Sequence, residues 1–315
     1  MEIQPFSSEK SRIIIRTFAR RGFFRGLSPP QSSVDKLQVI FAWRAFSVTL
    51  KRYTIFMSNP SSLQPFLDFT VQTAYMAGRA TLGYFQTDLI TEYKSDLTPV
   101  TAADRASENL IRSRIEERFP DHAIIGEEFG ENTVSGSSYK WIIDPIDGTK
   151  SFIRGVPLYA VLIGLEIDGV VRVGAAYFPA LDEMIAAADG LGCWWNGRRA
   201  HVSHVSTLEN GVVTFTDLNN FPEQGRQEAW DRICKRAYYR AGWTDAYGYA
   251  LVATGRTELA LDPIMNLWDC GPFPPILRES GGYFGDWQGN ETIYSSEAMA
   301  TTRTLLPEVL ELIQG

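Results

Sequence analysis

Residues Trp141–Phe152 read WIIDPIDGTKSF, and this stretch is the densest cluster of candidate functional residues in the chain. The apolar run before Asp144 predicts a buried strand, which Pro145 should end because proline cannot donate to a sheet ladder. Asp147 follows three residues after Asp144, and Gly148-Thr149 turns into the next segment. Two carboxylates at this spacing on a rigid turn can point at one spot. Asp-Pro and Asp-Gly are also common turn dipeptides, so an ordinary turn stays open as an alternative.

The residue types of this stretch suit a hard divalent cation. Mg²⁺ prefers oxygen ligands, usually one or two carboxylates together with water and substrate phosphate. Asp144 and Asp147 provide carboxylates, and the peptide carbonyl of Ile146 between them is a further oxygen. The N–H groups of Gly148 and Thr149 could hold an anion, as exposed amides at a turn or helix start do. The stretch therefore predicts a site for a cation and a phosphate.

Two other segments place acids beside apolar residues. Glu127 follows a predicted buried strand in IIGEEFG, and Asp269 stands at a predicted helix start in NLWDCGPF. Taken singly, Glu127 is typical of a solvated surface acid and Asp269 of a helix cap. Both become candidates for the same cation site once they are considered with Asp144 and Asp147.

The first half of the chain after Met57 predicts two helices and a hairpin-rich sheet. Apolar residues recur at helical spacing through Pro65–Gln86 and Asp104–Phe119, and Asp104 is the expected cap of the second helix. Asp168-Gly169 and Asn196-Gly197 are strong signals for two-residue hairpin turns. The predicted strands are Ala123–Ile125, Lys140–Ile143, Leu158–Ile167, Val170–Tyr177, Glu183–Ala188 and Gly192–Trp195. We expect an antiparallel sheet with helices packed on it.

The second half alternates helices with strands, which is typical of an α/β layer. A boundary near Ala200–Ser206 would divide residues 57–200 and 201–315 into two domains. The predicted helices are Arg226–Lys235, Ala246–Thr254 with Gly255 as its C-cap, Asp269–Ser280 and Pro307–Ile313. The predicted strands are Gly211–Thr216, Leu259–Asp262 and Tyr283–Asp286.

The composition is that of a globular protein, but its charge is uneven. The 315 residues include 44% hydrophobic and 21% charged residues and carry a net charge of −7. Residues 1–56 hold ten Lys/Arg against three Asp/Glu, so the remainder carries −14. An acidic body argues against nucleic-acid binding through a broad positive surface. The longest clean apolar stretches are shorter than the ~20 residues of a membrane-spanning helix, so no membrane partner is expected.

Residues 1–56 look foreign to the rest of the chain, and three interpretations stay open. The segment could be an organelle-targeting peptide, an extension upstream of a true start at Met57, or a disordered basic tail. In each case we expect it to be dispensable for the fold. Three cysteines without a CxxC pair fit a reducing compartment, so we expect a cytoplasmic protein, with organelle targeting by residues 1–56 as the alternative. Cys193 and Cys270 are expected core residues.

Taken together, the segments resemble a known family. GEE, DPIDGT and WD occur in this order, with TPVTAAD (Thr98–Asp104) upstream and ESGG (Glu279–Gly282) downstream. This set is similar to the inositol monophosphatase superfamily over about residues 65–313. The resemblance implies a layered αβαβα sugar-phosphatase fold and a Mg²⁺-dependent, lithium-sensitive phosphatase. It also implies a small-molecule phosphate ester as the partner, and it is compatible with a homodimer.

The resemblance assigns roles to individual residues. The metal ligands that it implies are Glu127, Asp144, the Ile146 carbonyl, Asp147 and Asp269. The pair that it implies for orienting and deprotonating the attacking water is Asp104 and Thr149, and Lys94 matches a lysine near the metal and the phosphate. None of these positions departs from the family pattern, which argues against an inactive protein that only keeps the fold.

Which phosphate ester such an enzyme would hydrolyse is harder to predict from the sequence. KSDLTPVTAADRASE and DPIDGTKSFIRGVPLYAVLIGLE look most like the histidinol-phosphatase branch, and so does DAYGYALVATG (Asp245–Gly255). An inositol-1-monophosphatase, a related sugar phosphatase and a 3′(2′),5′-bisphosphate nucleotidase stay open as alternatives. Asp245, Tyr247 and Asp262 are candidates to meet a cationic or imidazole-bearing alcohol, although a helix cap, a core aromatic and a turn acid are equally compatible. We expect Arg154–Pro157 and the Asp245–Gly255 helix to stand clear of the metal site.

Overall fold

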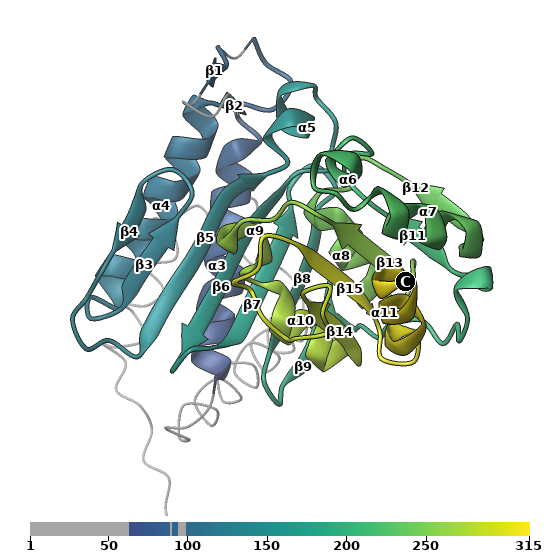
Figure 1. Ribbon diagram of the computed structural model, residues 1–315. Helices are drawn as coiled ribbons and strands as arrows, with labels where there is room; N and C mark the ends of the chain where they lie inside the picture. The colour runs from purple at the N-terminus through teal and green to yellow at the C-terminus, as the bar shows by residue number, and fades with distance from the viewer. Residues whose placement is uncertain (1–62, 89, 94–98) are drawn as a thin grey trace, which may run out of the picture. The chain divides into compact units, whose positions relative to one another are not determined.

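Two-residue hairpin turns set the course of the larger of two β-sheets. The computed structural model describes residues 63–88, 90–93 and 99–315, and the larger sheet lies in its first half (Figure 1). At both predicted turns the central residues have positive φ, 51° and 78° at Asp168-Gly169 and 45° and 76° at Asn196-Gly197. This conformation joins antiparallel strands with the twist that a sheet requires. Both hairpins form as the sequence predicts.

The larger sheet has eight strands in the order β10-β9-β8-β7-β6-β5-β3-β4. All neighbours are antiparallel except β3 and β5, which are parallel because the chain passes through the edge strand β4 before it returns. The expected antiparallel sheet is confirmed apart from this pair. The strands are β3 (Ala123–Gly126), β4 (Gly130–Asn132), β5 (Tyr139–Asp147), β6 (Ala160–Ile167), β7 (Val170–Phe178), β8 (Glu183–Ala188), β9 (Gly192–Trp195) and β10 (Arg198–Arg199). A separate two-stranded ladder joins β1 (Glu92–Tyr93) and β2 (Pro99–Val100).

Both faces of the larger sheet are covered by helices. Val161 and Ile163 of β6 pack with residues of α3 (Gln64–Thr81) and α4 (Ala102–Arg118). Leu162, between them, belongs to the cluster on the opposite face, together with residues of α10 (Phe273–Ser280). Successive side chains of a strand point to opposite faces, so a strand buried on both sides is apolar almost throughout.

The smaller sheet has five strands in the order β12-β11-β13-β15-β14. β11 is parallel to β12 and β13, whereas β15 runs antiparallel between β13 and β14. The sequence predicts β11, β13 and β14 but misses β12 and β15. The strands are β11 (Val212–Thr214), β12 (Tyr239–Ala241), β13 (Leu259–Asp262), β14 (Gly282–Gly285) and β15 (Ala298–Thr302).

The helices complete five layers (Figure 1). α8 (Ala246–Ala253) and α10 pack with both sheets, while α7 (Gln227–Arg236) and α11 (Leu306–Gln314) pack on the other face of the smaller sheet. The order of layers is therefore helix, sheet, helix, sheet, helix, which confirms the expected αβαβα fold. The remaining short helical segments are α5 (Thr149–Ile153), η1 (Leu208–Asn210), α6 (Asn220–Glu223) and α9 (Leu267–Cys270).

Two helix predictions are corrected by the structure. Thr101, not Asp104, is the N-cap of α4; Asp104 stands three positions inside the helix and completes a capping box. The helix predicted over Asp269–Ser280 is two helices, α9 and α10, separated at Gly271-Pro272. Pro272 has no N–H and its ring would clash inside a helix, so the helical hydrogen-bond ladder breaks there.

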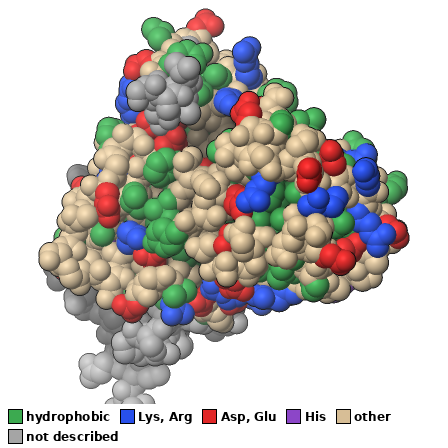
Figure 2. All heavy atoms as spheres, viewed as in Figure 1, with side chains coloured by type: hydrophobic (Ala, Val, Ile, Leu, Met, Phe, Trp, Pro, Cys, Tyr) green, Lys and Arg blue, Asp and Glu red, His purple; other side chains and the backbone are tan. Residues whose placement is uncertain are grey.

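Several expectations are not settled by the fold. The described residues from 63 to 315 group as one compact unit, and the division near residue 200, between β10 and η1, stays a prediction. Residues 1–56 and Lys94 lie outside the described residues. None of the described helices combines the length and the hydrophobicity of a membrane span. On the face shown in Figure 2, Lys and Arg side chains lie among Asp and Glu side chains.

Candidate active site

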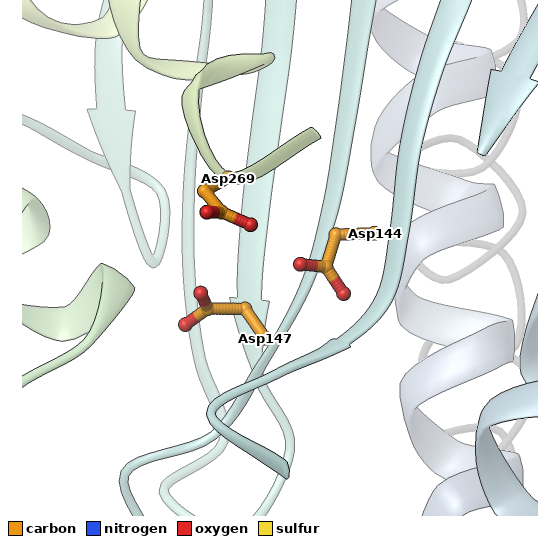
Figure 3. A group of neighbouring side chains, drawn as sticks. All are labelled: Asp144, Asp147 and Asp269. Atoms are coloured by element: carbon orange, nitrogen blue, oxygen red, sulfur yellow. The ribbon is translucent and has the colours of Figure 1, made fainter. Parts of the chain in front are cut away.

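A β-bulge at the end of β5 turns the carboxylates of Asp144 and Asp147 towards each other (Figure 3). Asp144 lies opposite Leu162 of β6 and Asp147 lies opposite Ala160, so β5 has one extra residue between these points. Pro145 does not end the strand as predicted. It stands in the bulge, where no ladder N–H is required, and the strand continues to Asp147.

Asp269 reaches the same place from α9. The Asn266 amide donates to Asp269 Oδ2 at 2.7 Å, and the Asn266 side chain caps the helix. The Ile146 amide donates to Asp144 Oδ1 at 3.0 Å and holds that carboxylate on the other side. Oxygens of Asp144, Asp147 and Asp269 lie within 4.8 Å of one another, and Figure 3 shows the three side chains converging. Three segments that the sequence singled out separately thus form one cluster.

Repulsion between carboxylates dominates the electrostatics of this cluster. Burial raises the pKa of Asp144 well above its usual range, and the charges of Glu127, Asp147 and Asp269 raise it further. The pKa of Asp147 is raised by burial and by the charges of Asp245 and Asp269. The pKa of Asp269 is raised to about 7, first by burial. A divalent cation between the carboxylates would remove this repulsion, and the all-oxygen donor set matches a hard cation. The cluster therefore fits a metal ion.

Glu127 and Asp104 lie beside the cluster. The Glu127 amide donates to the Ile143 carbonyl at 3.3 Å, next to Asp144, and the charge of Glu127 raises the pKa of both Asp144 and Asp104. Asp104 is fully buried, and its Oδ2 accepts from the amide and the hydroxyl of Thr101 at 2.8 and 2.7 Å. Its Oδ1 has no partner among the described residues. A buried carboxylate oxygen in this state suits a bound water.

Gly148 and Thr149 begin α5 directly after Asp147. Gly148 has a φ of 77°, which favours glycine, and a Cβ there would lie 3.0 Å from Asp245 Oδ2. Thr149 Oγ1 donates to the Ile146 carbonyl at 3.1 Å, so the carbonyl predicted as a metal ligand already accepts one hydrogen bond. A carbonyl oxygen has two lone pairs, which leaves one for a cation. The Thr149 oxygen likewise keeps lone pairs that can accept from a water.

A pocket of about 110 Å³ adjoins the cluster. Four of its lining residues are carboxylates, and most of the lining comes from the second half of the chain. The lining residues are Asp147, Thr216, Asn220, Asp245, Ala246, Tyr249, Asp262, Ile264, Met265 and Asp269. The predicted substrate-binding acids Asp245 and Asp262 are both among them, so the structure brings them together with the metal cluster.

Hydrogen bonds fix Asp262 in the pocket wall. Its Oδ1 accepts from the Thr216 amide at 2.9 Å and its Oδ2 from the Tyr249 hydroxyl at 3.0 Å. Burial raises the pKa of Asp262 to about 6. Both partners were missed at the level of sequence. Tyr249 had a signal, because it stands four residues after Asp245 and this spacing puts two side chains on one face of a helix.

Asp245 ties the start of α8 to the metal cluster. Its Oδ2 accepts from the Ser151 hydroxyl at 3.0 Å, and its backbone has the rare φ and ψ of 44° and −142°. The next amide, of Ala246, donates to Asp147 Oδ2 at 2.8 Å. The expectation that the Asp245–Gly255 helix stands clear of the metal site is therefore wrong. A strained backbone of this kind persists only where its surroundings hold it.

Other predicted contacts fall outside the pocket. Tyr247 does not line it, because the Tyr247 hydroxyl donates to Glu183 Oε1 at 3.1 Å and Arg256 lies 5.3 Å over the ring. Arg154–Pro157 does not line it either, and the Gly155 carbonyl accepts from the Gln86 side chain at 3.0 Å. Cys193 and Cys270 are buried, as expected of core residues.

The arrangement agrees with a comparison to known families. The family model of the inositol monophosphatase family matches residues 62–314. The chain belongs to the inositol monophosphatase family. A histidinol-phosphatase from Chlorobaculum parvum is 41% identical over 245 residues, which cover 78% of this chain and 94% of the relative. A histidinol-phosphatase from Mycobacterium tuberculosis is 37% identical over 228 residues, which cover 71% and 87%.

A solved structure gives the same result for the fold. The inositol monophosphatase from Anabaena superposes with a TM-score of 0.71 at 30% identity, covering 80% of this chain and 96% of that one. With the family match and its curated relatives, this makes the chain a phosphomonoesterase, a hydrolase of phosphate esters. Enzymes of the inositol monophosphatase family are typically metal-dependent, and the aspartate cluster is a place where this chain could bind a metal.

Proposed function

We propose that this chain is a Mg²⁺-dependent histidinol-phosphatase, which converts L-histidinol phosphate to L-histidinol in histidine biosynthesis. The observation that carries the proposal is the acidic pocket beside the three-aspartate cluster. The names of the relatives that are 41% and 37% identical support the same substrate. In this proposal the phosphate group binds at the aspartate cluster, and the alcohol part of the ester binds in the acidic pocket.

The residues proposed to hold Mg²⁺ are Glu127, Asp144, the Ile146 carbonyl, Asp147 and Asp269. Bound divalent cations supply positive charge that neutralises the phosphoryl oxygens and lowers the pKa of a water. Hydrolysis of a phosphate monoester depends mainly on such charge stabilisation and on in-line positioning. No nucleophilic side chain is needed in this scheme.

Asp104 and Thr149 are proposed to position the attacking water. The Thr149 hydroxyl donates to the Ile146 carbonyl, so its oxygen is oriented to accept a hydrogen from water. The free Oδ1 of Asp104 can take up a proton, and burial already raises the pKa of this carboxyl. The amides of Gly148 and Thr149 open α5, where N–H groups have no intrahelical acceptor, and we assign them to the phosphate. Lys94 is proposed to lie near the phosphate as well.

The alcohol pocket is proposed to select a cationic leaving group. Asp245 and Asp262 would attract the amino group and the imidazole of histidinol, whereas an uncharged ring of hydroxyls gains less from buried carboxylates. The second candidate is an inositol-1-phosphatase. The likeness to the Anabaena inositol monophosphatase, which extends over 80% of this chain, favours it.

Phosphate release from a panel of esters, with and without Mg²⁺, tests the proposal. We expect kcat/KM for histidinol phosphate to exceed that for inositol-1-phosphate by about a hundredfold or more, because unpaired polar groups in a pocket discriminate strongly. A ratio near one would overturn the substrate, while hydrolysis that persists in excess EDTA would overturn the metal dependence. Asp245→Asn should reduce kcat/KM for histidinol phosphate far more than for inositol-1-phosphate.

Location and assembly are part of the same proposal. Cys193, Cys234 and Cys270 are free thiols, which supports a reducing compartment such as the cytoplasm. We also propose a homodimer on the ground of the family resemblance, and sedimentation equilibrium tests it.

A further inference from the structure

Glu108 is a buried acid on α4 that the scheme above does not use. It stands one helical turn after Asp104, and its side chain is fully buried. A buried carboxylate is stable only if it is paired with a cation or accepts hydrogen bonds. Arg112, one turn further along, donates from Nε to Glu108 Oε1 at 2.7 Å. The Arg112 guanidinium also donates to the Gly130 carbonyl, so the pair links α4 to the turn between β3 and β4.

The Glu108 carboxylate accepts two backbone hydrogen bonds from that turn. The Glu128 amide donates to Oε2 at 2.8 Å and the Phe129 amide donates to Oε1 at 3.3 Å. On the other side, the carboxylate lies against Gly126, where a Cβ would come within 2.2 Å of Oε1. A larger residue at position 126 would therefore displace the Glu108 carboxylate from this place. Glu108 contacts the backbone both before and after Glu127.

Glu127 itself is held from the opposite direction. Its amide donates to the Ile143 carbonyl of β5 at 3.3 Å, and Asp144 is the next residue of that strand. The backbone at Glu127 is thus fixed between α4 on one side and the strand that carries Asp144 on the other. Without Glu108, two of the amides in this turn would lose their acceptor.

We propose that Glu108, paired with Arg112, is a positioning residue for Glu127: it fixes residues 126–129 so that the Glu127 carboxylate is presented to the aspartate cluster. The inference rests on the proposed function, because it takes Glu127 as a ligand of the catalytic cation. Residues that orient metal ligands in this way typically change metal affinity by about 10–100-fold when mutated.

Calorimetric titration of the purified full-length protein with Mg²⁺ tests this role without substrate. Glu108→Gln should raise the Mg²⁺ Kd by about tenfold or more, while kcat at saturating Mg²⁺ changes by less than about threefold. Glu127→Gln is the reference and should weaken binding at least as much. Ile115→Val is the matched control, because Ile115 is buried on the same helix and touches the core instead of the turn. It should lower the melting temperature and leave the Kd unchanged.

The outcomes separate this inference from the proposed function. An unchanged Kd in Glu108→Gln or in Glu127→Gln overturns the positioning role, and so does an equal loss of affinity in Ile115→Val. A different result overturns the proposed function but not the positioning role. In that result Glu108→Gln binds Mg²⁺ more weakly, while the wild type does not hydrolyse histidinol phosphate. Glu108→Asp keeps the charge beside Arg112 but shortens the reach to the two amides. If Glu108→Gln does not fold, Glu108→Asp replaces it, and we expect the same rise of about tenfold or more in the Mg²⁺ Kd.

Discussion

Asp144 is surrounded by other acids, so its ionised carboxylate is stable only beside a positive charge. Glu127, Asp147 and Asp269 all raise its pKa beyond the effect of burial. A charged carboxylate in this position destabilises the metal-free fold, because it repels its neighbours. A bound cation would offset this repulsion. A neutral amide of the same size separates these two effects.

Asp144→Asn should leave less than about a tenth of wild-type turnover at saturating Mg²⁺, because an amide is a poorer ligand than a carboxylate for a hard cation. In EDTA the variant should melt no lower than the wild type, since one of several repelling charges is gone. Phosphate release and thermal denaturation measure the two effects. Asp88→Asn, in which an exposed acid is neutralised, serves as the control. Turnover above a tenth would remove Asp144 from the proposed ligands.

Asp262 makes stability depend on pH in a defined window. Burial raises the pKa of Asp262 to about 6, above the 3.8 of a solvent-exposed aspartate. Between these values the folded protein holds a proton that the unfolded chain has released, so this group stabilises the fold at low pH and the contribution is lost as the pH rises through 6. The effect is at most about 1.4 kcal/mol per pH unit, or a few degrees in melting temperature.

Asp262→Asn should remove this component. In EDTA, the melting temperature of the variant should fall less between about pH 4 and pH 6 than that of the wild type. Asp88→Asn should keep the wild-type slope, because its carboxylate is exposed. Parallel curves for Asp262→Asn and the wild type would show that Asp262 is ionised throughout this range.

Individual residues of the site were predictable where a short motif carries them. DPIDGT, GEE and WD indicated Asp144, Asp147, Glu127 and Asp269, and three of these converge in the structure. Tyr247 does not line the pocket, because residues two apart on a helix face different directions. Glu108 was missed although it lies in the motif stretch KSDLTPVTAADRASE, because its role depends on a turn twenty residues later in the chain.

At the level of elements, two glycines let a helix junction rest directly on the larger sheet. A Cβ at Gly164 of β6 would lie 2.3 Å from the Gly271 carbonyl, and one at Gly174 of β7 would lie 2.1 Å from the Pro272 carbonyl. The junction of α9 and α10 therefore contacts the strands through backbone atoms. Because α9 carries Asp269, this contact also sets the distance between Asp269 and β5.

Gly174→Ala should push the junction away from the sheet. We expect a loss of about 1–3 kcal/mol in the free energy of unfolding, as for overpacked cores, and weaker Mg²⁺ binding because Asp269 moves with α9. Chemical denaturation and calorimetric titration measure the two effects. Gly83→Ala is the control, since a Cβ there would meet its nearest atom at an ordinary 3.4 Å. Wild-type metal affinity in Gly174→Ala would show that α9 is positioned by other contacts.

Elements with strong local signals were predicted, and those defined by distant partners were not. The Asp168-Gly169 and Asn196-Gly197 hairpins form because their turn residues require it. β15 was missed because only two residues of Ala298–Thr302, both threonines, favour a strand, and the segment is held between β13 and β14. β12 has a single sheet neighbour, β11, which is also distant in sequence.

At the scale of the whole molecule, metal binding should couple to global stability. A ligand that binds only the folded state stabilises it by about 2.7 kcal/mol at a hundred times its Kd. For a unit of this size, that corresponds to a rise of roughly 5–10 °C in melting temperature. Differential scanning calorimetry with increasing Mg²⁺ measures the rise, which Asp144→Asn should largely abolish. An equal rise in that variant would place the stabilising ion elsewhere.

The family match begins at residue 62, which bears on the basic N-terminal segment. A chain that starts at Met57 should keep the melting temperature and turnover of the full-length protein, because it retains every residue of the matched region. Thermal denaturation and phosphate release compare the two chains. A large loss of either in the shorter chain would show that residues 1–56 contribute to the folded enzyme.

Most of the pocket wall comes from a later part of the chain than the groups proposed to position the attacking water, although the proposed metal ligands Asp147 and Asp269 line the pocket as well. Eight of its ten lining residues fall between Thr216 and Met265, whereas Asp104, Glu127, Asp144 and Thr149 precede them all. Under the proposed function, the alcohol that relatives recognise can diverge through substitutions in this segment while Asp104, Glu127, Asp144 and Thr149 stay constant. Relatives named for two different esters are what such divergence would leave behind.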